Sequence, residues 1–318
     1  MTTLTAAAET FASRLSHVSV TLLVVAIALH VAGLLLRATA WWSVLSAAVP
    51  SRRAPWRGLT GAYLAGTGVN NVIPARGGDV ARVVLATRAV PGACCPTIAS
   101  SLLVETLLDT LIGAGLIVWA VSTGALPFQL LRTQLPGGSW TLIAAALAVP
   151  VALVVAACLV RDRAAAALAE ARRGFAILAS PRAYLVRVAL PQVAAWMLRV
   201  LAMYCFLHAF HIDGQMNHAA LALLAGSVTT LVPLTPGGVG TQQALLVVLL
   251  AGVAAPAAVL SFSLGTQLVI TVVNVTLGGA CMAFMLGRVP WRMRVPAPVE
   301  PAPALVPVAV PAPAISGD

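Results

Sequence analysis

Five stretches of this chain are apolar over lengths that suit a membrane span. They cover roughly residues 18–36, 97–121, 140–160, 183–210 and 257–287. A bilayer core is ~30 Å thick, so a spanning helix needs about 20 apolar residues. Helices meet the further requirement that backbone polar groups in lipid be hydrogen-bonded within the chain. The sequence therefore predicts an all-α polytopic membrane protein.

The composition agrees with a membrane location. Sixty per cent of the residues are hydrophobic and nine per cent are charged. The first apolar stretch is not followed by a convincing small-residue cleavage site, so we expect a retained span and not a removed signal peptide.

Two segments of the chain repeat each other. Residues 62–78 read AYLAGTGVNNVIPARGG and residues 222–238 read ALLAGSVTTLVPLTPGG, with seven of 17 positions identical. Each copy is an apolar run broken by proline and paired glycines. Broken hydrophobic segments at matching places in two halves of a membrane protein point to a transport site near the midplane.

The arginines predict the orientation. The formal net charge is +10 and the chain has no lysine. Arginines gather in the loops between spans, which indicates membrane orientation and no nucleic-acid partner. By the positive-inside rule, regions 37–57, 161–187 and 288–294 are cytoplasmic, whereas 122–139 and 211–217 are outside. In a plasma (inner) membrane the C-terminus is then cytoplasmic and the N-terminus outside.

This threading predicts inverted structural repeats. Repeat one covers about 18–121, the span at 140–160 is a linker, and repeat two covers about 183–287. Each broken segment must then enter and leave on one side, as a re-entrant, Pro/Gly-broken helical hairpin. The alternative is that each is an ordinary kinked span. Residues 1–288 form the membrane domain, and 289–318 are predicted to be a disordered Pro/Ala-rich cytoplasmic tail.

Charged side chains stand inside or beside the apolar spans. Arg76, Asp79 and Arg82 follow the first break at three-residue spacing, which places them on one helix face. Glu105 and Asp109, four residues apart, also share a face. A charge at membrane depth costs ~2.5–3.5 kcal/mol even on the permissive insertion scale. We therefore expect counter-ions, with Arg76, Arg82 and Arg199 as the candidates.

Three explanations of these charges stay open. They form an ion-paired cluster that fixes helix packing, a site for an anionic group such as phosphate, or a route for protons through a carboxyl group of raised pKa. The five cysteines lack paired metal-ligand spacing, and no nucleophile–base arrangement is evident. We therefore predict no metal, no cofactor and no enzymatic activity.

The motifs NNVIPARGGDVAR (70–82), ETLLD (105–109) and PLTPGGVGTQQA (233–244) resemble the signatures of the lysylphosphatidylglycerol synthase transmembrane region, a flippase-like family also called UPF0104. The resemblance covers the chain to about residue 287. It implies a lipid translocase for an anionic phospholipid or a polyprenyl-linked lipid. The chain departs from the family at Thr241–Gln243, where members often carry an acid. It lacks a soluble aminoacyltransferase domain, so we expect no synthesis of lysylphosphatidylglycerol.

The resemblance and the buried charges together predict the substrate-binding residues: Asn71, Pro74, Arg76, Gly78, Asp79, Arg82, Glu105, Asp109, Arg199, Pro233, Pro236, Gly237, Gly238, Gly240 and Gln243. The expected partners are membrane lipids. Two other functions stay open, namely a non-catalytic membrane partner of a lipid-modifying enzyme or glycosyltransferase, and a small-solute secondary transporter.

Overall fold

The computed structural model describes residues 18–50, 54–73, 77–90, 92–124, 172–231 and 240–288. Every regular element in these residues is a helix, which confirms the all-α prediction. Three short pieces, η2 (Ala176–Ala179), α9 (Pro181–Tyr184) and η3 (Leu185–Ala189), lead into the second half of the chain. The larger helices are α2 (Val20–Ala48), α3 (Trp56–Val72), α4 (Gly77–Ala89), α5 (Cys95–Ser122), α10 (Leu190–Ala209), α11 (Met216–Leu231), α12 (Thr241–Leu249) and α13 (Pro256–Arg288).

Four helical stretches in the described residues are long and apolar enough to cross a membrane: Val20–Ala48, Cys95–Ser122, Pro181–Ala209 and Pro256–Gly287. They confirm four of the five predicted spans. The predicted linker span at 140–160 and the tail at 289–318 lie outside the described residues.

The first span is longer than the sequence predicted. Helix α2 continues to Ala48, so Arg37 lies inside the helix and the prediction that a loop begins at residue 37 is wrong. The physical reason is that carboxylates of α5 neutralise this arginine. Arg37 can therefore lie within the membrane-spanning helix.

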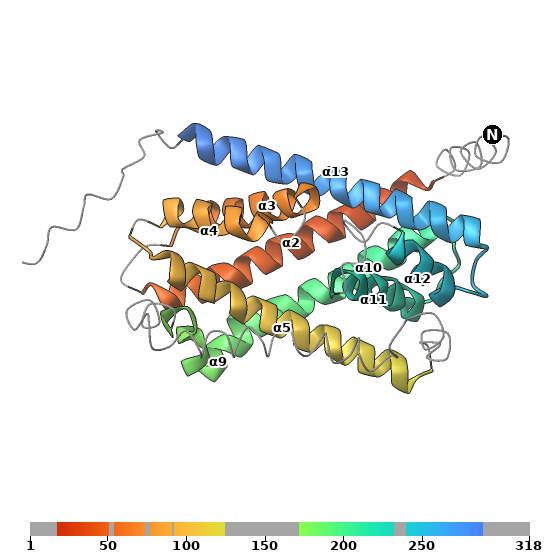
Figure 1. Cartoon of the computed structure of the whole chain (residues 1–318), viewed down its shortest axis with the longest axis horizontal. Helices are drawn as coiled ribbons and strands as arrows, with labels where there is room; N and C mark the ends of the chain where they lie inside the picture. Colours follow the sequence, from red (N-terminus) through yellow and green to blue (C-terminus); the bar gives the residue numbers. More distant parts are fainter. Residues whose placement is uncertain are drawn as a thin grey trace, which may run out of the picture.

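The chain repeats one order of helices, in which a long helix is followed by two shorter helices and a second long helix (Figure 1). We call α2–α5 unit one and α10–α13 unit two. The two copies of the repeated motif fall at matching places. The first runs from α3 across a break into α4, and the second begins in α11 and continues past it. The prolines of both copies lie outside the described residues.

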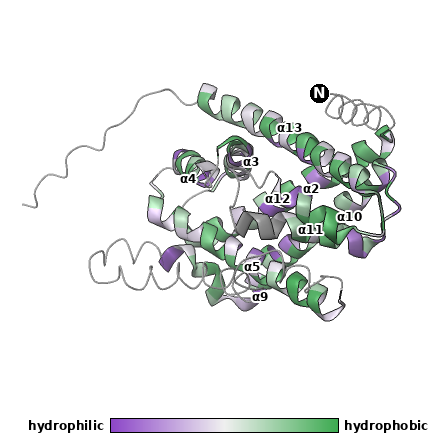
Figure 2. Ribbon diagram, turned by 45° about the vertical axis from the view of Figure 1, so that its right-hand side comes forward, coloured by the Kyte–Doolittle hydropathy of each residue, from purple (hydrophilic) through white to green (hydrophobic). Residues whose placement is uncertain are grey.

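The last helix of each unit packs against helices of the other unit. The start of α2 lies at the end of α10, where the Ser19 N–H donates to the Ala209 carbonyl at 3.0 Å, so these helices run antiparallel. The end of α5, with Ala120, packs among the apolar side chains of α10, α11 and α12. The end of α13, with Met285, packs in turn against α2, α3 and α4. In Figure 2 apolar residues predominate along α5, α10 and α13, and α4 is more hydrophilic.

Glycines of α3 allow two close backbone contacts, one with unit two and one within unit one. Where α3 crosses α13, a Cβ atom added at Gly68 would lie 2.9 Å from the Cα of Gly278. Where α3 meets α4, a Cβ atom at Gly78 would lie 2.0 Å from the carbonyl oxygen of Gly66. Small residues let membrane helices approach this closely. Two glycines of the repeated motif, Gly66 and Gly78, thus join the arms of the first hairpin.

Candidate functional site

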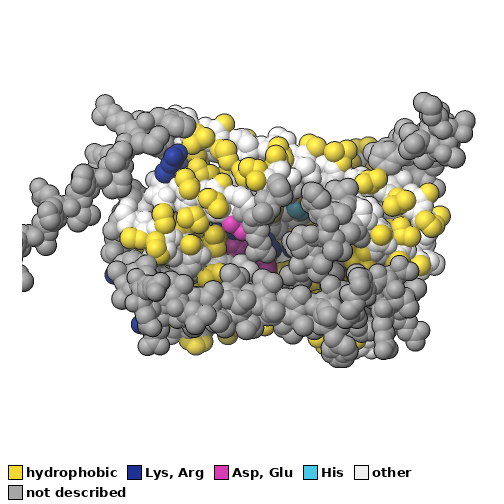
Figure 3. Space-filling view, viewed as in Figure 1, with side chains coloured by type: hydrophobic (Ala, Val, Ile, Leu, Met, Phe, Trp, Pro, Cys, Tyr) yellow, Lys and Arg dark blue, Asp and Glu magenta, His cyan; other side chains and the backbone are white. Residues whose placement is uncertain are grey.

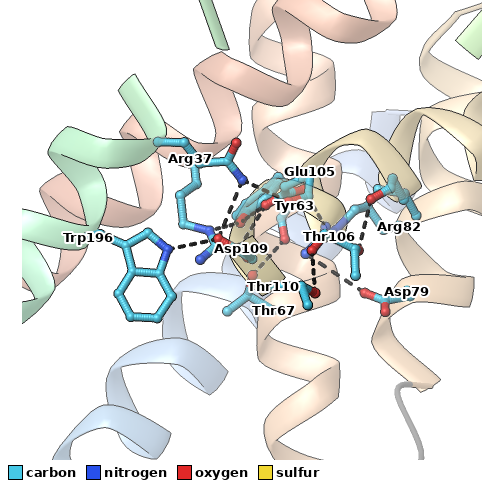
Figure 4. A network of polar contacts seen from close by, with 12 residues as sticks. Arg37, Tyr63, Thr67, Asp79, Arg82, Glu105, Thr106, Asp109, Thr110 and Trp196 are labelled. Atoms are coloured by element: carbon cyan, nitrogen blue, oxygen red, sulfur yellow. Dashed lines mark hydrogen bonds and ion pairs between the residues drawn. The ribbon is translucent and has the colours of Figure 1, made fainter. Parts of the chain in front are cut away.

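A network of polar contacts connects the middle parts of α2 and α5 (Figure 4). Glu105 and Asp109 lie one turn apart on α5 and both bind Arg37 of α2, so the prediction that they share a face is confirmed. Arg37 Nη2 lies 3.0 Å from Glu105 Oε1 and also contacts Asp109 Oδ2. One guanidinium therefore bridges two neighbouring carboxylates, and a second cation is needed to balance their charge.

Helix α3 adds a hydroxyl to this pairing. Arg37 Nε donates to the Tyr63 hydroxyl at 2.8 Å, and that hydroxyl donates to Glu105 Oε1 at 2.8 Å. Tyr63 is therefore a hydrogen-bonded bridge between the arginine and the carboxylate. Its ring is 2% exposed, so its position is set by packing between the helices.

Helix α4 supplies the second arginine. Arg82 Nη1 lies 3.3 Å from Glu105 Oε2, which confirms Arg82 as a counter-ion. Its guanidinium carbon lies 4.1 Å from the centre of the Tyr63 ring, a cation–π contact, and 5.7 Å from that of Trp41. Asp79, at 4.0 Å, is a weaker partner on the preceding turn. The Arg82 Nε–H is buried without a hydrogen-bond acceptor.

Unit two completes the network through α10. Trp196 Nε1 donates to Asp109 Oδ1 at 2.9 Å. Gln192, which is fully buried, donates to the Glu105 carbonyl at 3.1 Å and lies 3.5 Å from Asp109 Oδ1. We call Arg37, Tyr63, Arg82, Glu105, Asp109, Gln192 and Trp196 the central network. It draws residues from α2, α3, α4, α5 and α10.

The central network is electrically balanced and unevenly buried. Its two arginines match its two carboxylates. The side chains of Glu105 and Arg82 are only 5% and 9% exposed, whereas those of Arg37 and Asp109 are 15% and 24% exposed. Asp79, beside the network, is 34% exposed. Figure 3 shows acidic side chains and a histidine reaching the surface in the middle of one face. One side of the network is thus accessible from outside the helix bundle.

The tip of the first hairpin is held by Asn70. Its Oδ1 accepts the Gly78 N–H at 2.8 Å, which caps the start of α4, and its Nδ2 lies 3.3 Å from Asp79 Oδ1. The predicted Asn71 instead donates to the Thr67 carbonyl at 2.8 Å, within its own helix. Both asparagines line a cavity of about 270 Å³ that extends to α10, α11, α12 and α13.

The second hairpin is capped in a similar way. Gly240 has φ +92°, a left-handed conformation that suits glycine, and its N–H donates to Gln243 Oε1 at 2.6 Å. Gln243 also donates to Gln267 of α13 at 3.0 Å. Gly240 and Gln243 thus shape the start of α12, whose Gln242 and Leu246 line the same cavity.

The structure brings together only part of the predicted site. Gly78, Asp79, Arg82, Glu105 and Asp109 meet at or beside the central network. Arg199 makes no ion pair with a described residue, and its guanidinium carbon lies 4.7 Å from the Trp196 ring centre. Six predicted residues lie outside the described part of the chain: Pro74, Arg76, Pro233, Pro236, Gly237 and Gly238.

Sequence reasoning missed Arg37, Tyr63, Gln192 and Trp196. Arg37 carried a signal that could have found it, because the residues after it, ATAWWSVLSAAV, continue the apolar run. An arginine in the middle of a 29-residue helix must find an acid. Tyr63, Gln192 and Trp196 carried no comparable signal, since none of them has a charge that must be paired.

Comparison with known proteins gives one match. The family model described as the lysylphosphatidylglycerol synthase TM region matches residues 2–278. No curated protein and no solved structure matches the chain.

Replacing Arg37 tests the central network. In Arg37→Gln, two carboxylates lose their shared cation, and breaking a buried pair in this way costs roughly 3–5 kcal/mol. We expect a large drop in the unfolding temperature of the purified protein in detergent. Arg57→Gln, at an exposed arginine of α3 outside the network, is the matched control and should unfold close to the wild-type temperature. Equal destabilisation by the two changes would show that Arg37 contributes no more to stability than the control arginine does.

Proposed function

The chain belongs to the lysylphosphatidylglycerol synthase transmembrane-region family, and on this premise we propose that it moves an anionic lipid between the leaflets of a membrane. The substrate would be a phospholipid or a polyprenyl-linked lipid with a phosphate in its headgroup. The chain would bind and release this lipid without changing it covalently.

One observation carries the proposal, namely the partial exposure of a balanced charge network halfway along the spanning helices. A headgroup that crosses a bilayer needs polar groups where lipid offers none. Arg37 and Asp109 offer a cation and an anion at that depth and are reachable from outside the bundle. Arginine's planar fork suits phosphate, and Asp109 would hold Arg37 in place until phosphate replaces the carboxylate.

We further propose that the two units are inverted in the membrane and that both hairpins are re-entrant. Helix α4 has 13 residues and α12 has nine, so at 1.5 Å per residue they reach about 20 Å and about 14 Å, less than a ~30 Å bilayer core. Neither crosses alone. The antiparallel packing of α2 on α10 supports the inversion.

Single-cysteine labelling tests this threading. In a background without native cysteine, Asn217→Cys and Ala251→Cys flank the second hairpin and should both react with an impermeant reagent added outside. Arg57→Cys and Arg88→Cys flank the first hairpin and should both react only after the cells are opened. All four positions are exposed in the structure. Opposite labelling at the two ends of one hairpin would mean that the segment crosses the membrane.

We propose that the two carboxylates position arginines and do not carry protons. Glu105 contacts Arg37, Arg82 and the Tyr63 hydroxyl, and Asp109 contacts Arg37 and Trp196. These contacts hold both carboxylates against the arginines and fix the positions of the guanidinium groups. The competing function, a non-catalytic membrane partner of another enzyme, is favoured by the internal balance of the same charges, since such a network also stabilises a purely structural core.

The variant Asp109→Asn distinguishes lipid translocation from the structural role. The asparagine can still accept from Trp196, so the packing is retained, but Arg37 then has one carboxylate in place of two. The freed positive charge should hold an anionic headgroup too tightly. We expect translocation to slow at least tenfold, a barrier increase of about 1.4 kcal/mol. The measurement is the loss of fluorescence from labelled phosphatidylglycerol in reconstituted vesicles after an external quencher is added.

The control is Asp213→Asn, which changes an exposed aspartate in the turn before α11. It should translocate at the wild-type rate. Unfolding temperatures of both variants verify that each is folded. If folded Asp109→Asn moves lipid as fast as wild type, the central network is not on the lipid path. If wild type moves no lipid, the structural role is favoured.

A further inference from the structure

The cavity between the hairpins is polar but uncharged. It encloses about 270 Å³, and none of the described residues that line it carries a charge. Its apolar wall includes Met203 and Phe262. Its polar groups are amides and hydroxyls from both units, among them Asn70, Asn71, Gln242, Ser263, Thr266 and Gln267.

Two hydroxyls of this cavity have no hydrogen-bond partner among the residues that the structure describes. Ser263 and Thr266 of α13 are 4% and 5% exposed, and neither hydroxyl oxygen has a hydrogen-bond partner. Serine and threonine in helices often bond to the carbonyl four residues earlier. Ser261, on the same helix, does so to Ala257 at 2.9 Å. A buried hydroxyl without a partner is destabilising, so both groups are suited to a polar ligand.

The polar groups of the cavity match a particular ligand chemistry. Hydroxyls both donate and accept, and asparagine and glutamine amides do the same. A ligand with neighbouring hydroxyls can therefore satisfy them, and a buried ammonium would lack a carboxylate among the described lining residues. The volume lies just under the ~300 Å³ at which sites for drug-sized ligands begin, which fits the alcohol part of a headgroup.

We propose that this cavity binds the uncharged, hydroxyl-bearing part of the lipid headgroup, a glycerol or a sugar. The inference rests on the proposed lipid translocation and specifies its substrate. Asn70 places the cavity beside the central network, because it lines the cavity and also contacts Asp79. The phosphate of the lipid then lies on the side of the arginines. The hydroxyls of the glycerol or sugar reach Ser263 and Thr266.

Binding to the purified full chain in detergent, measured by native mass spectrometry, tests this subsite. Phosphatidylglycerol should bind more tightly than phosphatidylethanol, which has the same charge and no headgroup hydroxyl. Glucosyl-diacylglycerol should likewise bind more tightly than diacylglycerol if a sugar is the natural occupant. Either preference supports the subsite, and comparing the two preferences distinguishes a glycerol headgroup from a sugar. Absence of both preferences overturns it, as does tighter binding of lysyl-phosphatidylglycerol than of phosphatidylglycerol.

Variants assign the preference to the two hydroxyls. The double change Ser263→Ala with Thr266→Val should reduce the preference for the hydroxylated lipid roughly tenfold, as expected for two lost hydrogen bonds. Binding of phosphatidylethanol should not change. Ser261→Ala is the matched control and should keep the full preference. Thr266→Ser should retain most of it and serves if the double variant does not fold.

The result separates the subsite from translocation itself. If wild type moves phosphatidylglycerol while the double variant keeps the wild-type preference, the subsite is wrong and the translocase proposal survives. If wild type neither binds nor moves any of these lipids, translocation fails and this inference fails with it.

Discussion

Two carboxylates on one apolar helix must be neutralised, and this requirement determines how the surrounding helices are held together. Glu105 and Asp109 cannot remain charged in lipid without cations, and Arg37 and Arg82 supply them from α2 and α4. The Tyr63 hydroxyl and the Trp196 indole then complete the hydrogen bonds from α3 and α10. Five helices are thereby fixed around one point near the middle of the bundle.

The first hairpin packs closely along its helices and is polar at its tip. Glycines on α3 allow backbone contact with α4 at Gly78 and with α13 at Gly278, which holds the hairpin in place. Its tip, with Asn70 and Asn71, instead faces the cavity. A closely packed helix pair with asparagines near its tip is suited to holding a headgroup at depth, because these donors and acceptors are in position before the ligand arrives.

The sequence predicted four of the membrane spans and the carboxylate pair, since each rests on local composition or spacing. That the broken segments are re-entrant hairpins stays a prediction. It did not predict Arg37, because an arginine beside tryptophans is also typical of a membrane interface. Gln192 and Trp196 contact carboxylates more than 80 residues away, and no local pattern encodes such a pairing. Ser263 and Thr266 resemble any hydroxyl residues of a membrane helix, and only the fold distinguishes them from Ser261. The roles of all these residues in lipid binding remain predictions.

A structure of the full chain determined with phosphatidylglycerol tests the central claim most directly. The account predicts density for a phosphate beside Arg37 or Arg82 and for the glycerol in the cavity between Asn70 and Thr266. Asp109 should then have moved away from Arg37. Lipid density confined to the outer faces of α5 and α13, with every contact of the central network unchanged, would contradict the account.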